Sequence, residues 1–280
     1  MSHMKGGRKN HSHGSKKGHL GEKGKEIAQN VDEDSLVMRQ FRAYGAELDD
    51  KNDRFERILK ICRDITIESK RIIYLLHTID NESKQGSILN QAKTKLQNVA
   101  QNHFKRIALE LEKEGPYQYL KAYRSSLEEY IEAVTFYQYL HNDELEGWSE
   151  IEKMITYTIT DKPEPRTIRT LVTPREYILG IADLTGELMR KCINNLGTQD
   201  IDNCYQICNF VKKMYTGFLS CTHFSNKEMN RKLFTLEQSL HKIENVCYII
   251  KVRGSEIPRH ILIDVATENY AESDEGYQGY

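Results

Sequence analysis

The sequence predicts an all-α protein, an elongated multi-helix bundle of about seven helices. Apolar residues recur at three- and four-residue spacing over long stretches, which is the period of an amphipathic helix. Only five of the 280 residues are proline, so few positions forbid a helix. Hydrophobic residues are 39% and charged residues 29% of the chain, a balance typical of a soluble helical protein. No apolar run approaches the ~18 residues of a membrane span, and no signal peptide is evident, so we expect no contact with a membrane.

The composition divides the chain into three parts. Residues 1–31 are rich in Gly, His, Lys and Ser, which predicts a disordered basic tail. Residues 32–266 form the predicted helical domain, and residues 267–280 form an acidic disordered tail. The formal charge of −1 excludes an argument from overall basicity to nucleic-acid binding, so such binding must use local patches. The six cysteines are scattered and lack zinc-site spacing, which favours reduced core thiols in an intracellular protein: Cys62, Cys192, Cys204, Cys208, Cys221 and Cys247.

Caps and breakers place the helices. The first begins near residues 32–35 and runs to about Ile79, which is long for a globular helix and suggests an extended packing surface. The other expected elements are helices over 87–114, 117–142, 174–197, 202–221 and 226–251, a short helix capped by Ser149, a loop over 158–173, and a short final helix after 258.

The helix that begins at Thr173 has the clearest start in the chain. Thr173 is the N-cap, Pro174 occupies the first helical position, and Glu176 completes a capping box. Gly180 and Gly186 lie inside this helix, where each costs about 1 kcal/mol relative to alanine. We therefore expect another backbone or a ligand to lie close to them.

Two pairs of acids lie on this helix and on the helix over 117–142. Asp183 and Glu187 lie opposite the apolar stripe of their helix, whereas Glu129 and Glu132 lie among apolar neighbours. An acid in apolar surroundings is usually paired, protonated or bound to a metal. If the two helices face each other, four carboxylates converge on a site suited to Mg²⁺ or Mn²⁺. The alternative is an ordinary solvated helix face, with Glu187 paired to Arg190 or a neighbouring lysine.

The first helix carries the densest basic residues of the folded part. They lie in the stretch 57–71 and include Lys70 and Arg71. These side chains either contact phosphates or form a solvated face, and the sequence leaves both readings open.

Four stretches resemble the translin family, in the branch of translin-associated factor X. They are RDITIESKR at 63–71, LEEYIEAVTF at 127–136, TPREYILGIADLTGELMRKCIN at 173–194 and KVRGSEIPRHIL at 251–262. With the helical spacing between them, the resemblance covers about residues 35–265. It implies an all-α fold that assembles with translin into a hollow hetero-octamer.

The resemblance also implies an activity, that of component 3 promoter of RISC. This is an Mg²⁺-dependent endoribonuclease that removes the nicked passenger strand of small interfering RNA and trims tRNA fragments, with Mn²⁺ as a second usable metal. It would contact single-stranded small RNA, or single-stranded DNA, and RISC components indirectly, in both nucleus and cytoplasm. Carried over by motif, the catalytic and metal-binding acids are Glu129, Glu132 and Asp183, with Glu187 as a fourth. Lys70, Arg71 and Arg190 are the candidates that would position the RNA backbone.

Two other classes of protein fit the same residues. In the first, the chain is a non-catalytic scaffold that stabilises translin, and the acids are structural. In the second, it is an all-α nucleotide pyrophosphatase, whose Glu-x-x-Glu helices also hold Mg²⁺. That class needs a Glu-x-x-Asp helix nearer in sequence, whereas here Asp183 follows Glu132 by about fifty residues.

Overall fold

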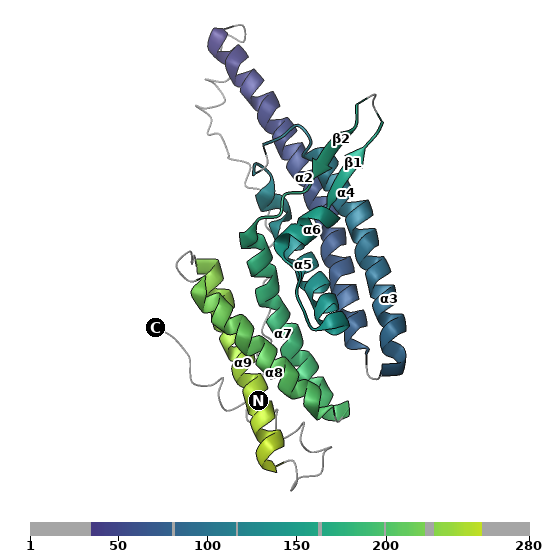
Figure 1. The fold of residues 1–280 in the computed structure, drawn as a ribbon. Coiled ribbons are helices and arrows are strands. Elements are labelled where there is room, and N and C mark those ends of the chain that lie inside the picture. The colour runs from purple at the N-terminus through teal and green to yellow at the C-terminus, as the bar shows by residue number, and fades with distance from the viewer. Residues whose placement is uncertain are drawn as a thin grey trace, which may run out of the picture. The chain divides into compact units, whose positions relative to one another are not determined.

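The protein is all-α, as predicted (Figure 1). The computed structural model describes residues 35–79, 82–115, 117–161, 164–198, 200–221 and 227–253. Both predicted tails and the short final helix lie outside these residues. The helices are α2 (Leu36–His77), α3 (Glu82–Val99), the π-helix η1 (Ala100–Phe104), α4 (Lys105–Glu110), α5 (Leu120–Asn142), α6 (Trp148–Met154), α7 (Pro174–Thr198), α8 (Ile201–Ser220) and α9 (Lys227–Arg253). None of these helices has the length and apolar character needed to span a bilayer.

The chain forms two compact units, with the boundary between Asn52 and Asp53 inside α2. In the first unit, α2 exposes a row of large apolar side chains: Leu36, Val37, Phe41, Tyr44 and Leu48. The last four follow one another at three- and four-residue spacing and therefore share one face of the helix.

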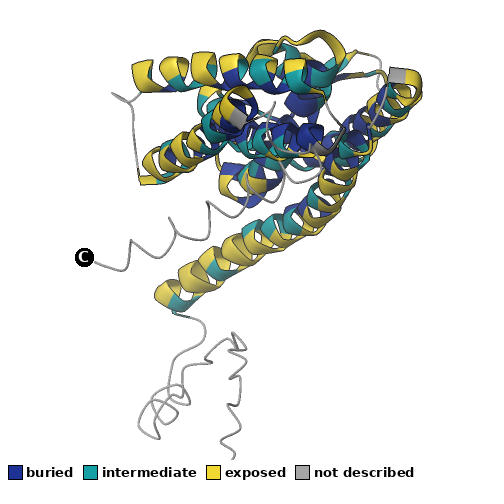
Figure 2. Ribbon diagram, turned by 90° about the horizontal axis from the view of Figure 1, so that it is seen from below, coloured by how far each residue is buried: buried dark blue, intermediate teal, exposed yellow. Residues whose placement is uncertain are grey.

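The second unit contains the hydrophobic core. Helix α5 packs along α7, and α7 in turn packs against α8 and α9. Buried residues gather where these helices meet (Figure 2), and the largest fully buried side chains include Tyr123, Tyr130 and Phe136, all on α5. Because α5 has buried side chains on several sides, its acids are held in largely apolar surroundings.

The predicted helix over 87–114 is interrupted by η1, a correction to the sequence prediction. Here the carbonyl of Ala100 accepts a hydrogen bond from Tyr157 Oη at 2.6 Å, and that of Phe104 accepts one from Thr170 Oγ1 at 3.1 Å. Tyr157 precedes the loop expected over 158–173, and Thr170 lies within it. In place of a simple loop, the structure has the antiparallel strands β1 (Thr156–Ile159) and β2 (Arg166–Arg169). Alternating β-branched residues explain the hairpin, because they place Tyr157 and Ile168 together on the core side.

The predicted start of α7 is confirmed. Thr173 donates its hydroxyl to the Glu176 carboxylate, and the Tyr177 amide donates to the Thr173 carbonyl at 3.1 Å. The predicted cap of α6 is wrong, since the N-cap is Gly147, two residues before Ser149, in an extended conformation and without a side-chain hydrogen bond.

The prediction that the cysteines are free thiols of the core is confirmed for five of the six. All six cysteines are free thiols, and all are buried except Cys221, which is half-buried. The buried thiols Cys192, Cys204, Cys208 and Cys247 gather where α7, α8 and α9 pack together.

Candidate active site

The two acid-bearing helices face each other, and Gly180 sets how closely they approach. A Cβ atom at Gly180 would lie 2.7 Å from Ile131 Cβ and Cγ2, and 3.0 Å from the carbonyl oxygen of Glu128. The expectation of a nearby backbone is therefore confirmed at Gly180. It fails at Gly186, where a Cβ atom would meet nothing within 4 Å.

Three of the four predicted carboxylates line one pocket, between α2, α5 and α7. The pocket has a volume of about 620 Å³, and its wall includes Glu129 and Glu132 from α5 and Glu187 from α7. Three basic side chains were predicted to bind the RNA backbone, and two of them, Lys70 and Arg190, line the pocket as well. The third, Arg71, does not line it and pairs with Glu68 at 2.6 Å.

Two of these acids have cationic or imidazole partners. Lys70 Nζ lies 3.1 Å from Glu129 Oε1. Glu187 Oε2 lies 2.5 Å from His77 Nε2 and 3.0 Å from Arg190 Nη1. The Glu187–Arg190 ion pair expected on a solvated face is thus present, but it lies at the wall of a pocket.

Glu132 is the acid that lacks such a partner. In the described part of the chain, no hydrogen bond or ion pair reaches its side chain, and the residue is 9% exposed. Burial, followed by the nearby charges of Asp183, Glu187 and Glu129, raises its pKa from 4.5 to about 8, against the opposing effect of Lys232. The carboxyl of Glu132 is therefore mostly protonated near neutral pH, because burial and the neighbouring carboxylates both disfavour its charged form.

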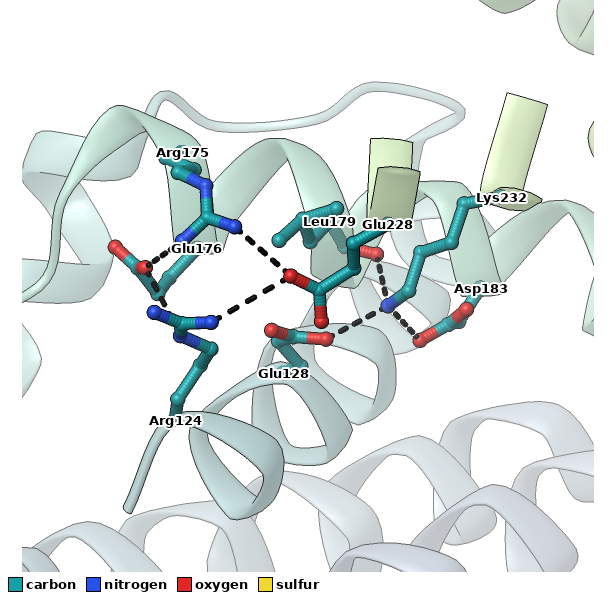
Figure 3. A network of polar contacts seen from close by, with 8 residues as sticks. All are labelled: Arg124, Glu128, Arg175, Glu176, Leu179, Asp183, Glu228 and Lys232. Carbon is teal, nitrogen blue, oxygen red and sulfur yellow. Dashed lines mark hydrogen bonds and ion pairs between the residues drawn. The ribbon is translucent and has the colours of Figure 1, made fainter. Parts of the chain in front are cut away.

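Asp183, the fourth predicted acid, is held by a lysine from α9. Lys232 Nζ lies 2.7 Å from Asp183 Oδ2 and 2.7 Å from Glu128 Oε2, and it donates to the Leu179 carbonyl at 2.9 Å (Figure 3). These three acceptors match the three protons of an ammonium group. Burial lowers the pKa of Lys232, but its bonds to the two carboxylates outweigh this and leave the pKa raised. Asp183 does not line the pocket, yet it is near enough to Glu132 to influence its charge.

A second ion-pair cluster lies beside Lys232 and fixes the same three helices. Glu228 Oε2 on α9 lies 2.8 Å from Arg175 Nη2 on α7 and 3.5 Å from Arg124 Nη1 on α5 (Figure 3). Both arginines also contact the carboxylate of Glu176, each at 3.4 Å. This cluster holds α9 in place, and with it the Lys232 side chain.

Sequence reasoning missed three residues of the site. Tyr74 and His77 line the pocket. Tyr74 follows Lys70 on α2 by four residues and His77 follows Tyr74 by three, so a helical wheel of α2 could have grouped them. Lys232 could not have been found in this way, because it lies 49 residues after Asp183 and 104 after Glu128.

The donor chemistry of the pocket suits a hard divalent cation, although the side chains as placed do not form a ligand set. No three His, Cys, Asp or Glu side chains among the described residues are arranged to hold a metal ion. The acids are instead paired with protein cations, or in the case of Glu132 destabilised in the charged form. Carboxylate oxygens are nonetheless the ligands that Mg²⁺ and Mn²⁺ prefer, and the raised pKa of Glu132 indicates a place where added positive charge would be stabilised.

Comparison with known proteins identifies the family. The family model described as Translin family matches residues 53–254. The chain is 42% identical to the translin-associated protein X of Pongo abelii over 250 residues, which cover 85% of this chain and 86% of that protein. It is 25% identical to a translin-associated protein X homolog of Schizosaccharomyces pombe over 235 residues, covering 82% and 95% of the two chains.

Solved structures share the fold at low sequence identity. The crystal structure of AfC3PO has a TM-score of 0.55 at 19% identity and covers 82% of this chain and all of that chain. A structure of AfC3PO in complex with duplex RNA has a TM-score of 0.52 at 18% identity, covering 84% and 100%. With the family match over most of the second unit, these comparisons lead to one conclusion. The chain belongs to the translin family.

Proposed function

We propose that this chain is the catalytic subunit of a metal-dependent endoribonuclease that it forms with translin. The single observation that carries the proposal is the pocket in which Glu129, Glu132 and Glu187 lie beside Lys70 and Arg190. Hydrolysis of a phosphodiester requires carboxylates that bind a cation, next to basic side chains that bind phosphate. The duplex RNA bound in the AfC3PO complex supports RNA as the substrate class.

In this proposal Glu129, Glu132 and Glu187 would hold Mg²⁺ or Mn²⁺, with Asp183 available once Lys232 releases it. When bound, the ion supplies positive charge to the scissile phosphate and favours ionisation of water. Lys70 and Arg190 have mostly exposed side chains, so each can exchange its carboxylate partner for a backbone phosphate. Glu132 keeps its proton near neutral pH in the metal-free chain and would release it on binding a cation.

Cleavage of single-stranded RNA by the assembled complex tests the proposal. Chelation with EDTA should abolish cleavage, and added Mg²⁺ or Mn²⁺ should restore it. Attack by water should leave 5′-phosphate and 3′-hydroxyl ends, which labelling and mass spectrometry of the products would identify. Products with cyclic 2′,3′-phosphates, or cleavage that persists in excess EDTA, would contradict the metal-dependent mechanism.

Acid variants separate catalysis from structure. Glu129→Ala, Glu132→Ala and Asp183→Ala should each slow cleavage by about 10²-fold or more, a size expected when a group of the reaction centre is lost. Assembly and RNA binding should remain near wild type. Glu150→Ala is the matched control, because Glu150 is an exposed helix acid that pairs with Lys153 three residues away and does not line the pocket.

A scaffold role is the second candidate, and one observation favours it. Asp183, Glu129 and Glu187 already have protein cations as partners, which is how structural acids are stabilised. If the acid variants melt well below wild type and cannot join translin, the scaffold role is correct. If they assemble and bind RNA but fail to cut it, the proposed nuclease function is correct.

The partner surface gives a separate prediction. We propose that the exposed face of Val37, Phe41, Tyr44 and Leu48 is buried in the translin-type assembly, since monomers rarely expose such a continuous apolar row. Phe41→Asp should then weaken assembly with translin by at least about tenfold, measured by light scattering after size-exclusion chromatography. Ala46→Asp is the control, because it places the same charge on the opposite face of α2. Equal assembly by both variants would remove this face from the interface.

A further inference from the structure

The pocket is larger than a metal site requires. A water molecule occupies about 30 Å³ of liquid, so a cation with its waters fills only a fraction of 620 Å³. Pockets of about 300–1,000 Å³ hold ligands of nucleotide size. The remaining wall should therefore show which part of an RNA strand it accepts.

The wall contributed by α2 contains an aromatic ring open to solvent. Tyr74 is 75% exposed although it lines the pocket, and it lies between Lys70 and His77 on the same face of the helix. Polar side chains that can hydrogen bond to a base edge line the pocket too, namely Thr78 and Asn194.

This combination matches the way proteins bind single strands. An aromatic ring offers a stacking surface to a nucleobase, while neighbouring cations bind the backbone on either side. Lys70 lies one helical turn from Tyr74 on α2, and Arg190 reaches the same pocket from α7. A base inside a duplex has both faces covered by its neighbours, so only an unpaired base can use such a surface.

We propose that Tyr74 stacks on an unpaired nucleobase of the RNA strand, with Thr78 and Asn194 as polar neighbours of that base. The inference deepens the proposed function, on which it rests, because it places a base subsite beside the acids. It also gives a physical reason for preferring single-stranded or nicked RNA over intact duplex.

A double-mutant cycle between protein and RNA tests the stacking. The probes are a short oligoadenylate and an oligomer of the same length whose riboses carry no base. Binding to the complex with translin is measured in EDTA, so that no strand is cut. Tyr74→Ala should weaken oligoadenylate binding by about tenfold, as for loss of one stacked base, and should leave binding of the abasic oligomer unchanged.

Three further variants keep the test interpretable. Tyr74→Phe retains the ring and should bind within about twofold of wild type, whereas Tyr74→Leu retains apolar bulk without the ring and should behave like alanine. Tyr248→Ala is the matched control, since Tyr248 is 63% exposed on α9 and does not line the pocket. If either Tyr74→Ala or Tyr74→Leu fails to assemble with translin, the other of these two variants still decides the result.

The outcomes distinguish the inference from the proposed function. Equal losses on both probes, no loss on either, or a leucine variant that binds like wild type would overturn the stacking. A wild-type complex that binds both probes equally would also overturn it. If base-dependent binding through Tyr74 is found but Mg²⁺ never produces cleavage, the stacking is correct and the nuclease is not. If wild type cuts RNA and Tyr74→Ala binds it as well as wild type does, the nuclease function is correct and the stacking is not.

Discussion

Gly180→Ala is expected to destabilise the protein, and Gly186→Ala on the same helix is expected to stabilise it. A methyl group at Gly180 would lie 2.7 Å from carbon atoms of Ile131, a residue with no exposed surface, so α5 and α7 would have to separate. Such overpacking costs up to about 3 kcal/mol, against ~1 kcal/mol gained from the helix propensity of alanine. At Gly186 only the gain applies, because the added methyl group meets open space.

Chemical denaturation of the two single variants, in parallel with wild type, measures these changes. We expect a net loss of about 2 kcal/mol for Gly180→Ala and a gain of about 1 kcal/mol for Gly186→Ala. Ile131→Ala creates a cavity of its own, but it also removes Cγ2, one of the two carbon atoms that the new methyl group would meet. Combined with Gly180→Ala it should therefore be less harmful than the two losses added together. A Gly180→Ala variant at least as stable as wild type would show that α5 and α7 do not meet at Gly180.

Glu132→Gln is expected to stabilise the metal-free protein increasingly as the pH rises from about 4.5 to about 8. The folded chain holds the pKa of Glu132 at about 8, whereas the unfolded chain titrates near 4.5. The favourable contribution of the protonated acid is fully present below pH 4.5 and is lost as the pH rises to about 8. Over that range wild type should lose a few kcal/mol relative to the variant, and the difference should stay constant at higher pH.

Thermal melting of both proteins across this pH range is the measurement. Adding Mg²⁺ at pH 8 should raise the melting temperature of wild type more than that of Glu132→Gln, since the proposed ion stabilises the ionised acid. Glu150→Gln serves as the control, because this exposed acid lies outside the pocket. A wild-type protein that is most stable at pH 8, with no gain from the Gln variant, would show that Glu132 is ionised without cost.

The sequence predicted those parts of the site that depend on one helix at a time. Helical spacing separates Glu129 and Glu132 from the main stripe of α5, and a glycine inside α7 indicates where another backbone approaches. The same reasoning could not show that Asp183 faces a lysine from α9, because ion pairs between distant segments leave no periodic pattern. It also missed η1, since the hydrogen bonds that Ala100 and Phe104 accept come from residues more than fifty positions away.

The Lys232 ammonium ties completion of the site to the order in which the chain is synthesised. Glu128 and Asp183 leave the ribosome first, and Lys232 follows Asp183 by 49 residues. At ordinary translation rates this is a delay of roughly 2 to 10 seconds. During that time Glu128 and Asp183 have no counter-charge from α9. The bridge from Glu128 through Lys232 to Asp183 therefore forms only after α9 has been made, and a nascent chain that stops before α9 would lack the positive charge that joins these two acids.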